Sequence, residues 1–414
     1  MDKALLTATL TVAQQIAEVA KALQQQRTGH APSAVTVVVS EDTLVVTSTY
    51  YMKELPAHVT RFNAQGPITR YRGATWDRAL PAAAYRQAGP DNVAAEEDIG
   101  GMGRTFPHRL SANVSSESFI EGFGTSPFEN EVVVDFAMEL VRAEQLGQDD
   151  DPDLLAVGFS ANDLVGHSFG PDSHEVMDMT IRTDRLLERF FAFLIQQVGR
   201  DRLVIALTAD HGVAPLPEVE RARRPRTNAA RIDPAVIAGA AERALRARFG
   251  APRGPAWMER PSWLVYQGWP SLYLNLWALE DRGIKVEDGE VVAKAAVRAV
   301  PGVEQVLTGS ELNQQRVRGA HSRSELSYDP ERSGQIFYVL APYLLPGAEP
   351  QGTNHGSPWT YDTHVPLLLF GSGVVAGTYT GRVGIADLAP TLSALLGISA
   401  PSGAQGRVLR EAVR

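Results

Sequence analysis

Two aspartates and three histidines lie beside apolar runs in a pattern that could bind metal ions. They are Asp163, His167, Asp210, His211 and His355. The first two follow one apolar run, the next two follow a second, and the last precedes a third. Carboxylate oxygens and imidazole nitrogens are hard-to-borderline ligands, so this set suits zinc or a similar divalent ion.

The spacing of these residues indicates how they could share ions. Asp163 and His167 are four residues apart, so one helical turn would place both on the same side. Asp210 and His211 are adjacent and need an irregular turn to converge, which Gly212 helps to permit. Two metals roughly 4 Å apart can hold a phosphoryl group, activate an oxygen nucleophile and stabilise the leaving oxygen. The spacing of Asp163 and His167 therefore suits two ligands of one metal ion.

Each motif alone has an ordinary structural explanation. An isolated Asp-x-x-x-His is more often a helix cap with a surface histidine, and an aspartate after a strand is a common turn former. Their joint occurrence after successive strands favours metal binding. His364 is interpreted as packing or as a neighbour of the ligands, and the acidic run Asp149–Asp151 as a turn instead of a calcium site.

The elements that must position these residues alternate between strand and helix. Leu154–Phe159 and Leu203–Thr208 are short continuous apolar runs, the pattern of strands buried on both faces of a parallel sheet. Ser173–Val198 between them predicts a long helix, which Gly199 ends. This order is a βαβ unit, and in open α/β sheets the carboxyl ends of the strands carry the site.

The fold class predicted from the whole chain is α/β, with a largely parallel central sheet flanked by helices and an inserted cap region. Further expected elements are a helix over Ala4–Leu23, paired strands Ala34–Val39 and Leu44–Ser48, a helix over Asn130–Glu144, a strand over Val365–Phe370 and a helix capped by Asp387 that runs to Leu396. One domain over 1–414 is expected, with about 217–352 as the inserted cap and a small α+β unit near Val291–Leu307.

Composition excludes several classes of partner. The net charge of -9 gives no electrostatic footprint for duplex nucleic acid or anionic lipid. No window approaches the ~20 apolar residues of a membrane span. The chain has no cysteine, which removes disulfide and thiolate chemistry. Its first residues lack the features of a signal peptide, and localisation stays open.

The motifs carry a resemblance to a known family. Ser160-x-x-Asp163-x-x-Gly166-His167 with Gly170-Pro171, then Thr208-Ala-Asp210-His211-Gly212, then His355-Gly356-Ser357-Pro358 resemble the alkaline phosphatase superfamily. The nearest branch is the single-chain bacterial alkaline phosphatases with a threonine nucleophile, related to the type I phosphodiesterase/nucleotide pyrophosphatase group. The resemblance implies an alkaline-phosphatase-like fold and a small phosphate-ester substrate.

The resemblance also implies two zinc sites. Asp163, His167 and His355 would bind the first ion, and Asp210 with His211 would bind the second. The family supplies the second ion with one more Asp, followed by a Thr or Ser nucleophile, and neither has a counterpart here. The second site is therefore expected to be incomplete, the chain truncated at its N-terminus and turnover impaired. The family's phosphate-holding Lys and Arg also lack a match, with Arg27 a weak candidate.

Three interpretations of function follow. The first is a zinc-dependent phosphomonoesterase by family. The second is a catalytically inactive metal-binding remnant or pseudoenzyme. The third is another chemistry of the superfamily, either a phosphodiesterase/nucleotide pyrophosphatase or, more weakly, a phosphoglycerate-mutase-like isomerase. The sequence leaves the physiological substrate and the oligomeric state open.

Overall fold

The chain divides into two compact units. The computed structural model describes residues 36–37, 45–46, 53–253, 261–318 and 323–414. The first unit is Met1–Asp210 with Val365–Arg414, and the second is His211–His364. The predicted cap at 217–352 lies inside the second unit, and its role as a cap stays a prediction. The helix expected over Ala4–Leu23 lies outside the described residues.

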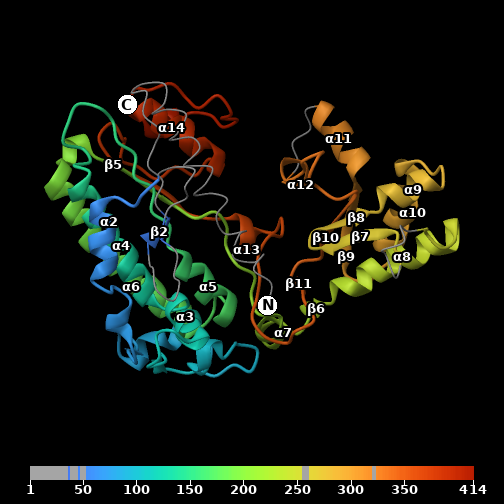
Figure 1. Ribbon diagram of the computed structural model, residues 1–414, viewed down its shortest axis with the longest axis horizontal. Helices are drawn as coiled ribbons and strands as arrows, with labels where there is room; N and C mark the ends of the chain where they lie inside the picture. The colour runs from blue at the N-terminus through green and yellow to red at the C-terminus, as the bar shows by residue number, and fades with distance from the viewer. Residues whose placement is uncertain (1–35, 38–44, 47–52, 254–260, 319–322) are drawn as a thin grey trace. The chain divides into compact units, whose positions relative to one another are not determined.

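The first unit is built on packed helices (Figure 1). They are α2 (Ala57–Ala64), α3 (Glu117–Gly124), α4 (Pro127–Ala143), α5 (Ser160–Phe169), α6 (His174–Val198) and α14 (Leu388–Leu395). The two long helices predicted from periodicity are confirmed as α4 and α6. The Ser173 hydroxyl accepts the Val176 N–H at the start of α6, and Gly199 follows its end with φ 89°.

The strands of this unit form short pairs. They are β1 (Thr36–Val37) with β2 (Val45–Val46), β3 (Thr75–Trp76) with β4 (His108–Arg109), and β5 (Val204–Thr208) with β12 (Leu367–Gly371). All three pairs are antiparallel. The α/β class and the predicted strands at β5 and β12 are confirmed. Among the described strands, β5 pairs only with β12, and this pairing is antiparallel instead of the parallel one that the sequence suggested.

Leu154–Phe159 is the clearest correction. The segment is not a strand, because no described strand pairs with it, and its exposure alternates between exposed and half-buried. A continuous apolar run becomes a strand only where a neighbour satisfies its backbone. The final helix also differs in detail. The Asp387 side chain does not cap α14, and its carboxylate instead accepts the N–H groups of Gly384 at 2.9 Å and Arg407 at 2.8 Å.

The second unit is a four-stranded sheet with helices on it, in the order β7-β8-β10-β9 (Figure 1). Its strands are β7 (Leu264–Gly268), β8 (Ser271–Leu274), β9 (Val303–Thr308) and β10 (Ile336–Leu340). The helices are α7 (Pro217–Arg223), α8 (Pro234–Phe249), α9 (Leu276–Asp281), α10 (Val286–Arg298), α11 (Gly309–Arg318), α12 (Arg323–Leu326) and α13 (Thr360–Thr363). A separate parallel pair joins β6 (Ala230–Ile232) to β11 (Leu344–Pro346).

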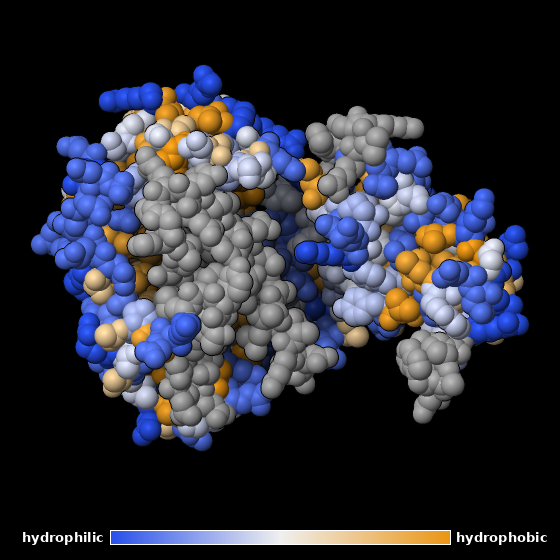
Figure 2. Space-filling view, turned by 45° about the horizontal axis from the view of Figure 1, so that its top comes forward, coloured by the Kyte–Doolittle hydropathy of each residue, from blue (hydrophilic) through white to orange (hydrophobic). Residues whose placement is uncertain are grey.

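The core of the second unit explains why β10 is continuously apolar. Ile336 and Tyr338 pack with α8 and α10 on one face of the sheet, and Phe337 and Val339 pack with Leu312 of α11 on the other. A strand covered on both faces needs no polar alternation. On the face in Figure 2 this unit shows hydrophobic atoms among hydrophilic ones, and its exposed large apolar residues are Val236, Val265, Tyr266, Leu276, Trp277, Val291 and Leu326. Among the described residues, no helix is both long and apolar enough to span a membrane.

The first unit also contains a buried group of ionisable side chains. His108 and Glu175 are fully buried, with His108 Nε2 2.9 Å from Glu175 Oε1. Glu96 is 1% exposed, and one of its oxygens accepts the Val93 N–H at 3.2 Å. Burial, reinforced by the negative charge of Glu175, raises the pKa of Glu96 from 4.5 to about 8. Ionising Glu96 in the folded chain therefore costs stability.

Stability is expected to fall between pH 4.5 and pH 8 because of Glu96. In that range Glu96 of the folded state holds a proton that the unfolded chain releases. The stabilisation that this proton provides is therefore full below pH 4.5 and lost above about pH 8. Glu96→Gln is neutral at every pH and keeps an oxygen for the Val93 N–H. Thermal unfolding should show this variant gaining stability over the wild type from pH 5 to pH 9. A stability difference between the variant and the wild type that stays the same from pH 5 to pH 9 would contradict the raised pKa of Glu96.

Candidate metal centre

Helix α5 brings the first two predicted ligands together. Asp163 lies in its first turn and His167 in its last, positions where the helix dipole favours a carboxylate and a cationic imidazole respectively. The helix ends at Gly170, whose φ of 79° suits glycine. Asp163 Oδ2 lies 3.4 Å from His167 Nε2, and both side chains are about a quarter exposed. The predicted placement on one side of a helical turn is confirmed.

A close approach of two backbone segments sets the direction of His211. Asp210 is exposed, two residues past the end of β5, and His211 follows it half-buried. The Gly212 N–H donates to the Asp362 carbonyl at 2.7 Å. A Cβ on Gly212 would lie 2.1 Å from the Tyr361 carbonyl oxygen, so only glycine fits without a backbone shift. The His211 Nδ1 is 2.9 Å from the Gly212 carbonyl, which leaves Nε2 as its outward ligand atom.

His355 stacks on His211. Their ring centroids are 3.4 Å apart with an interplanar angle of 13°. The two segments run side by side because the Ala214 N–H donates to the Asn354 carbonyl at 3.1 Å, and the Thr353 hydroxyl donates to the Ala214 carbonyl at 2.7 Å. These hydrogen bonds join parts of the chain that are about 140 residues apart in sequence.

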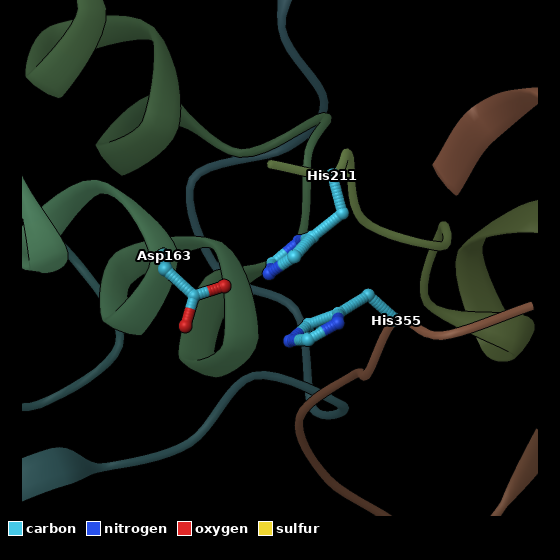
Figure 3. A group of neighbouring side chains, drawn as sticks. All are labelled: Asp163, His211 and His355. Atoms are coloured by element: carbon cyan, nitrogen blue, oxygen red, sulfur yellow. The ribbon is translucent and has the colours of Figure 1, made fainter. Parts of the chain in front are cut away.

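Three predicted ligands form one group. Figure 3 shows the Asp163 carboxylate and the imidazoles of His211 and His355 pointing toward one another. Each offers one ligand atom, and these atoms lie within 4.8 Å of one another, the one such group among the residues that the structure describes. Two nitrogens and one oxygen at this separation fit the donor set of a zinc-like ion. His167 contacts Asp163, and neither it nor Asp210 belongs to the group.

Asp362 is a residue of this centre that the sequence did not single out. Its side chain is buried, and Oδ2 accepts the Ser357 N–H at 2.7 Å, two residues from His355. Burial raises the pKa of Asp362, while the hydrogen bonds from Ser357 and the nearby His211 oppose that rise. The Asp362 carbonyl thus contacts the segment of His211, and the Asp362 carboxylate contacts the segment of His355. Nothing in the run Tyr361-Asp362-Thr363 signals this role, because it depends on two distant loops.

Comparison with known proteins shows the family. A profile of the type I phosphodiesterase / nucleotide pyrophosphatase family matches residues 18–248. The chain is 32% identical over 371 residues to the alkaline phosphatase PafA of Elizabethkingia meningoseptica, which covers 89% of this chain and 65% of the relative. It is 29% identical over 378 residues to the alkaline phosphatase PhoV of Synechococcus elongatus, covering 89% of this chain and 64% of the relative.

The solved structures agree. The crystal structure of wild-type PafA superposes with a TM-score of 0.78 at 29% identity, covering 89% of this chain and 69% of that one. The alkaline-phosphatase-like fold predicted from the motifs is thereby confirmed. The chain spans 65% and 64% of the length of these two curated relatives, which is less than two thirds. It belongs to the type I phosphodiesterase/nucleotide pyrophosphatase family, within the alkaline phosphatase superfamily.

Proposed function

We propose that this protein is a metal-dependent hydrolase of phosphate-ester small molecules. The observation that carries the proposal is the convergence of Asp163, His211 and His355, three side chains of the predicted ligand set, in a chain of this family. Nitrogen and oxygen donors of this kind hold zinc in hydrolases, and the relatives' names identify them as phosphatases.

The proposed metal is zinc, in two sites. Asp163, His167 and His355 would hold one ion, and Asp210 with His211 would hold the other. The stacking of His211 on His355 supports a shared centre, because the two histidines belong to different proposed sites. When bound, the metals would polarise the phosphoryl group and stabilise charge on the attacking and leaving oxygens.

The residues of the chain would supply position and charge. Asp163 and His167 lie one turn apart on the same side of α5, and the Gly212–Asp362 bond fixes the direction of His211. With a net charge of -9, the chain itself repels an anionic ester, so the metal centre would be the local positive charge that attracts it.

Turnover by residues 1–414 alone is proposed to be weak. Within them no residue matches the further Asp of the second site or the Thr or Ser nucleophile that the resemblance calls for. Double displacement through a covalent phosphoenzyme needs that nucleophile. The competing interpretation for these residues is a remnant that binds metal and hydrolyses nothing. A phosphodiesterase is the second candidate, and the description of the matching family favours it.

Metal content and ester hydrolysis measured on the same preparation test the proposal. The purified chain is stripped with a chelator and reloaded with zinc, and bound metal is counted by elemental analysis. p-Nitrophenyl phosphate and bis-p-nitrophenyl phosphate are then offered with and without zinc. We expect zinc to be retained and the monoester to be hydrolysed slowly and only in the presence of metal.

The alternatives predict different results. Zinc retained with no hydrolysis of either ester indicates the metal-binding remnant. Faster hydrolysis of the diester indicates a phosphodiesterase. A folded chain that retains no zinc after reloading contradicts the metal centre itself.

A further inference from the structure

A polar junction ties three helices of the first unit together next to Asp163. It consists of Asn130 of α4, Asn162 of α5 and Thr183 of α6. The Asn130 amide donates to Asn162 Oδ1 at 3.0 Å and to the Thr183 hydroxyl at 3.2 Å. The Thr183 hydroxyl in turn donates to Asn162 Oδ1 at 3.2 Å. Each helix thus contributes one side chain to a closed triangle of hydrogen bonds.

The orientation of Asn130 in this junction is fixed. Its side chain is 1% exposed, and its own carbonyl oxygen is buried without a hydrogen-bond partner among the described residues. Flipping the amide would place that oxygen against Asn162 Oδ1, acceptor against acceptor, and would lose the donated bond. A buried amide with one unsatisfied atom costs stability, and the two hydrogen bonds that the Asn130 amide donates offset part of that cost.

The junction acts on the turn of α5 that carries Asp163. Asn162 directly precedes Asp163, and its side chain is held from both α4 and α6. The three helices also meet through apolar side chains of one core cluster, such as Val132 of α4, Val165 of α5 and Met179 of α6. Apolar contacts tolerate small slides and rotations, whereas hydrogen bonds prescribe direction. A metal ligand must be held within about 0.5 Å of its working position, so the rotation of this turn matters.

We propose that Asn130 is a positioning residue for Asp163, acting through Asn162. The inference rests on the proposed function, because it takes Asp163 to be a metal ligand. It assigns to α4, which supplies none of the predicted ligands, the role of setting the direction in which the Asp163 carboxylate points.

Zinc affinity of the folded chain is the measurement that tests the inference. Residues that orient a metal ligand typically contribute 10–100-fold to affinity, so we expect Asn130→Ala to weaken zinc binding about tenfold in a competition titration with a chelating dye. Thr183 offers a matched pair. Thr183→Val keeps the shape and removes the hydroxyl, and should weaken zinc binding, whereas Thr183→Ser keeps the hydroxyl and should bind as the wild type does.

Two further variants separate positioning from general destabilisation. Val134 is fully buried on α4 in another cluster, so Val134→Ala should lower the melting temperature and leave zinc affinity unchanged. Asn162→Ala removes the link, and the double variant with Asn130→Ala should bind zinc no more weakly than Asn162→Ala alone.

The outcomes distinguish a failure of this inference from a failure of the proposed function on which it rests. Wild-type zinc affinity in Asn130→Ala, with binding lost in Asp163→Asn, overturns the positioning role and keeps the metal centre. Equal loss of affinity in Val134→Ala and Asn130→Ala also overturns it, because stability alone would then explain the effect. Wild-type zinc affinity in Asp163→Asn overturns the proposed ligand and the inference with it.

Discussion

Asp163→Asn is expected to weaken zinc binding by at least about 100-fold, which corresponds to about 2.7 kcal/mol. Asp163 supplies the carboxylate of the Asp163–His211–His355 group, and its charge offsets that of the ion. Asparagine has the same shape, so the loss would come from the missing charge and ligand strength, since a neutral amide oxygen is a weaker donor to zinc. Any zinc-dependent ester hydrolysis should fall with it.

Asp150→Asn is the matched control for that result. Asp150 is exposed in the acidic turn that precedes residue 154, and the same change of charge there should leave zinc affinity at the wild-type value. Circular dichroism of the metal-free proteins shows whether both variants fold. A folded Asp163→Asn chain that binds zinc as tightly as the wild type would remove Asp163 from the ligand set.

The sequence predicted the parts of this site that are local. Asp163 and His167 lie one turn apart on the same side of α5, and this placement follows from their spacing of four residues. Helix α6 was predicted correctly because Ser173 and Gly199 mark its ends and its apolar residues repeat at helical spacing. Such features depend on neighbours in the sequence.

Other parts depend on contacts that no local pattern encodes. The stacking of His211 on His355 follows from hydrogen bonds between residues near 214 and residues near 354. Leu154–Phe159 has the composition of a buried strand, yet it pairs with no described strand, and pairing decides whether a run becomes one. The Asn130 junction joins side chains that are 21 to 53 residues apart. Spacing along the chain does not reveal such a meeting.

Asp178→Ala is expected to lower the free energy of unfolding by about 3–5 kcal/mol. The Asp178 carboxylate is fully buried on α6 and accepts four hydrogen bonds. Trp76 Nε1 and Arg182 Nε donate to Oδ2 at 2.7 and 2.6 Å, and the Ala79 N–H donates to Oδ1 at 2.6 Å, joined there by the Tyr85 hydroxyl. Alanine would leave the buried donors of Trp76 and Tyr85 unpaired. Urea unfolding followed by tryptophan fluorescence measures the loss.

Asp178→Asn separates the charge of this group from its acceptors. Each carboxylate oxygen receives two donors, so an amide can serve only one of the two sets, whichever way it is turned. If the hydrogen bonds dominate, Asp178→Asn should therefore lower the free energy of unfolding by less than Asp178→Ala does. An equal loss in the two variants would show that the negative charge facing Arg182 dominates instead. Asp184 is exposed on the same helix, so the free energy of unfolding of Asp184→Ala should stay within about 0.5 kcal/mol of the wild-type value. A loss as large as that of Asp178→Ala would contradict a role for the buried acceptor.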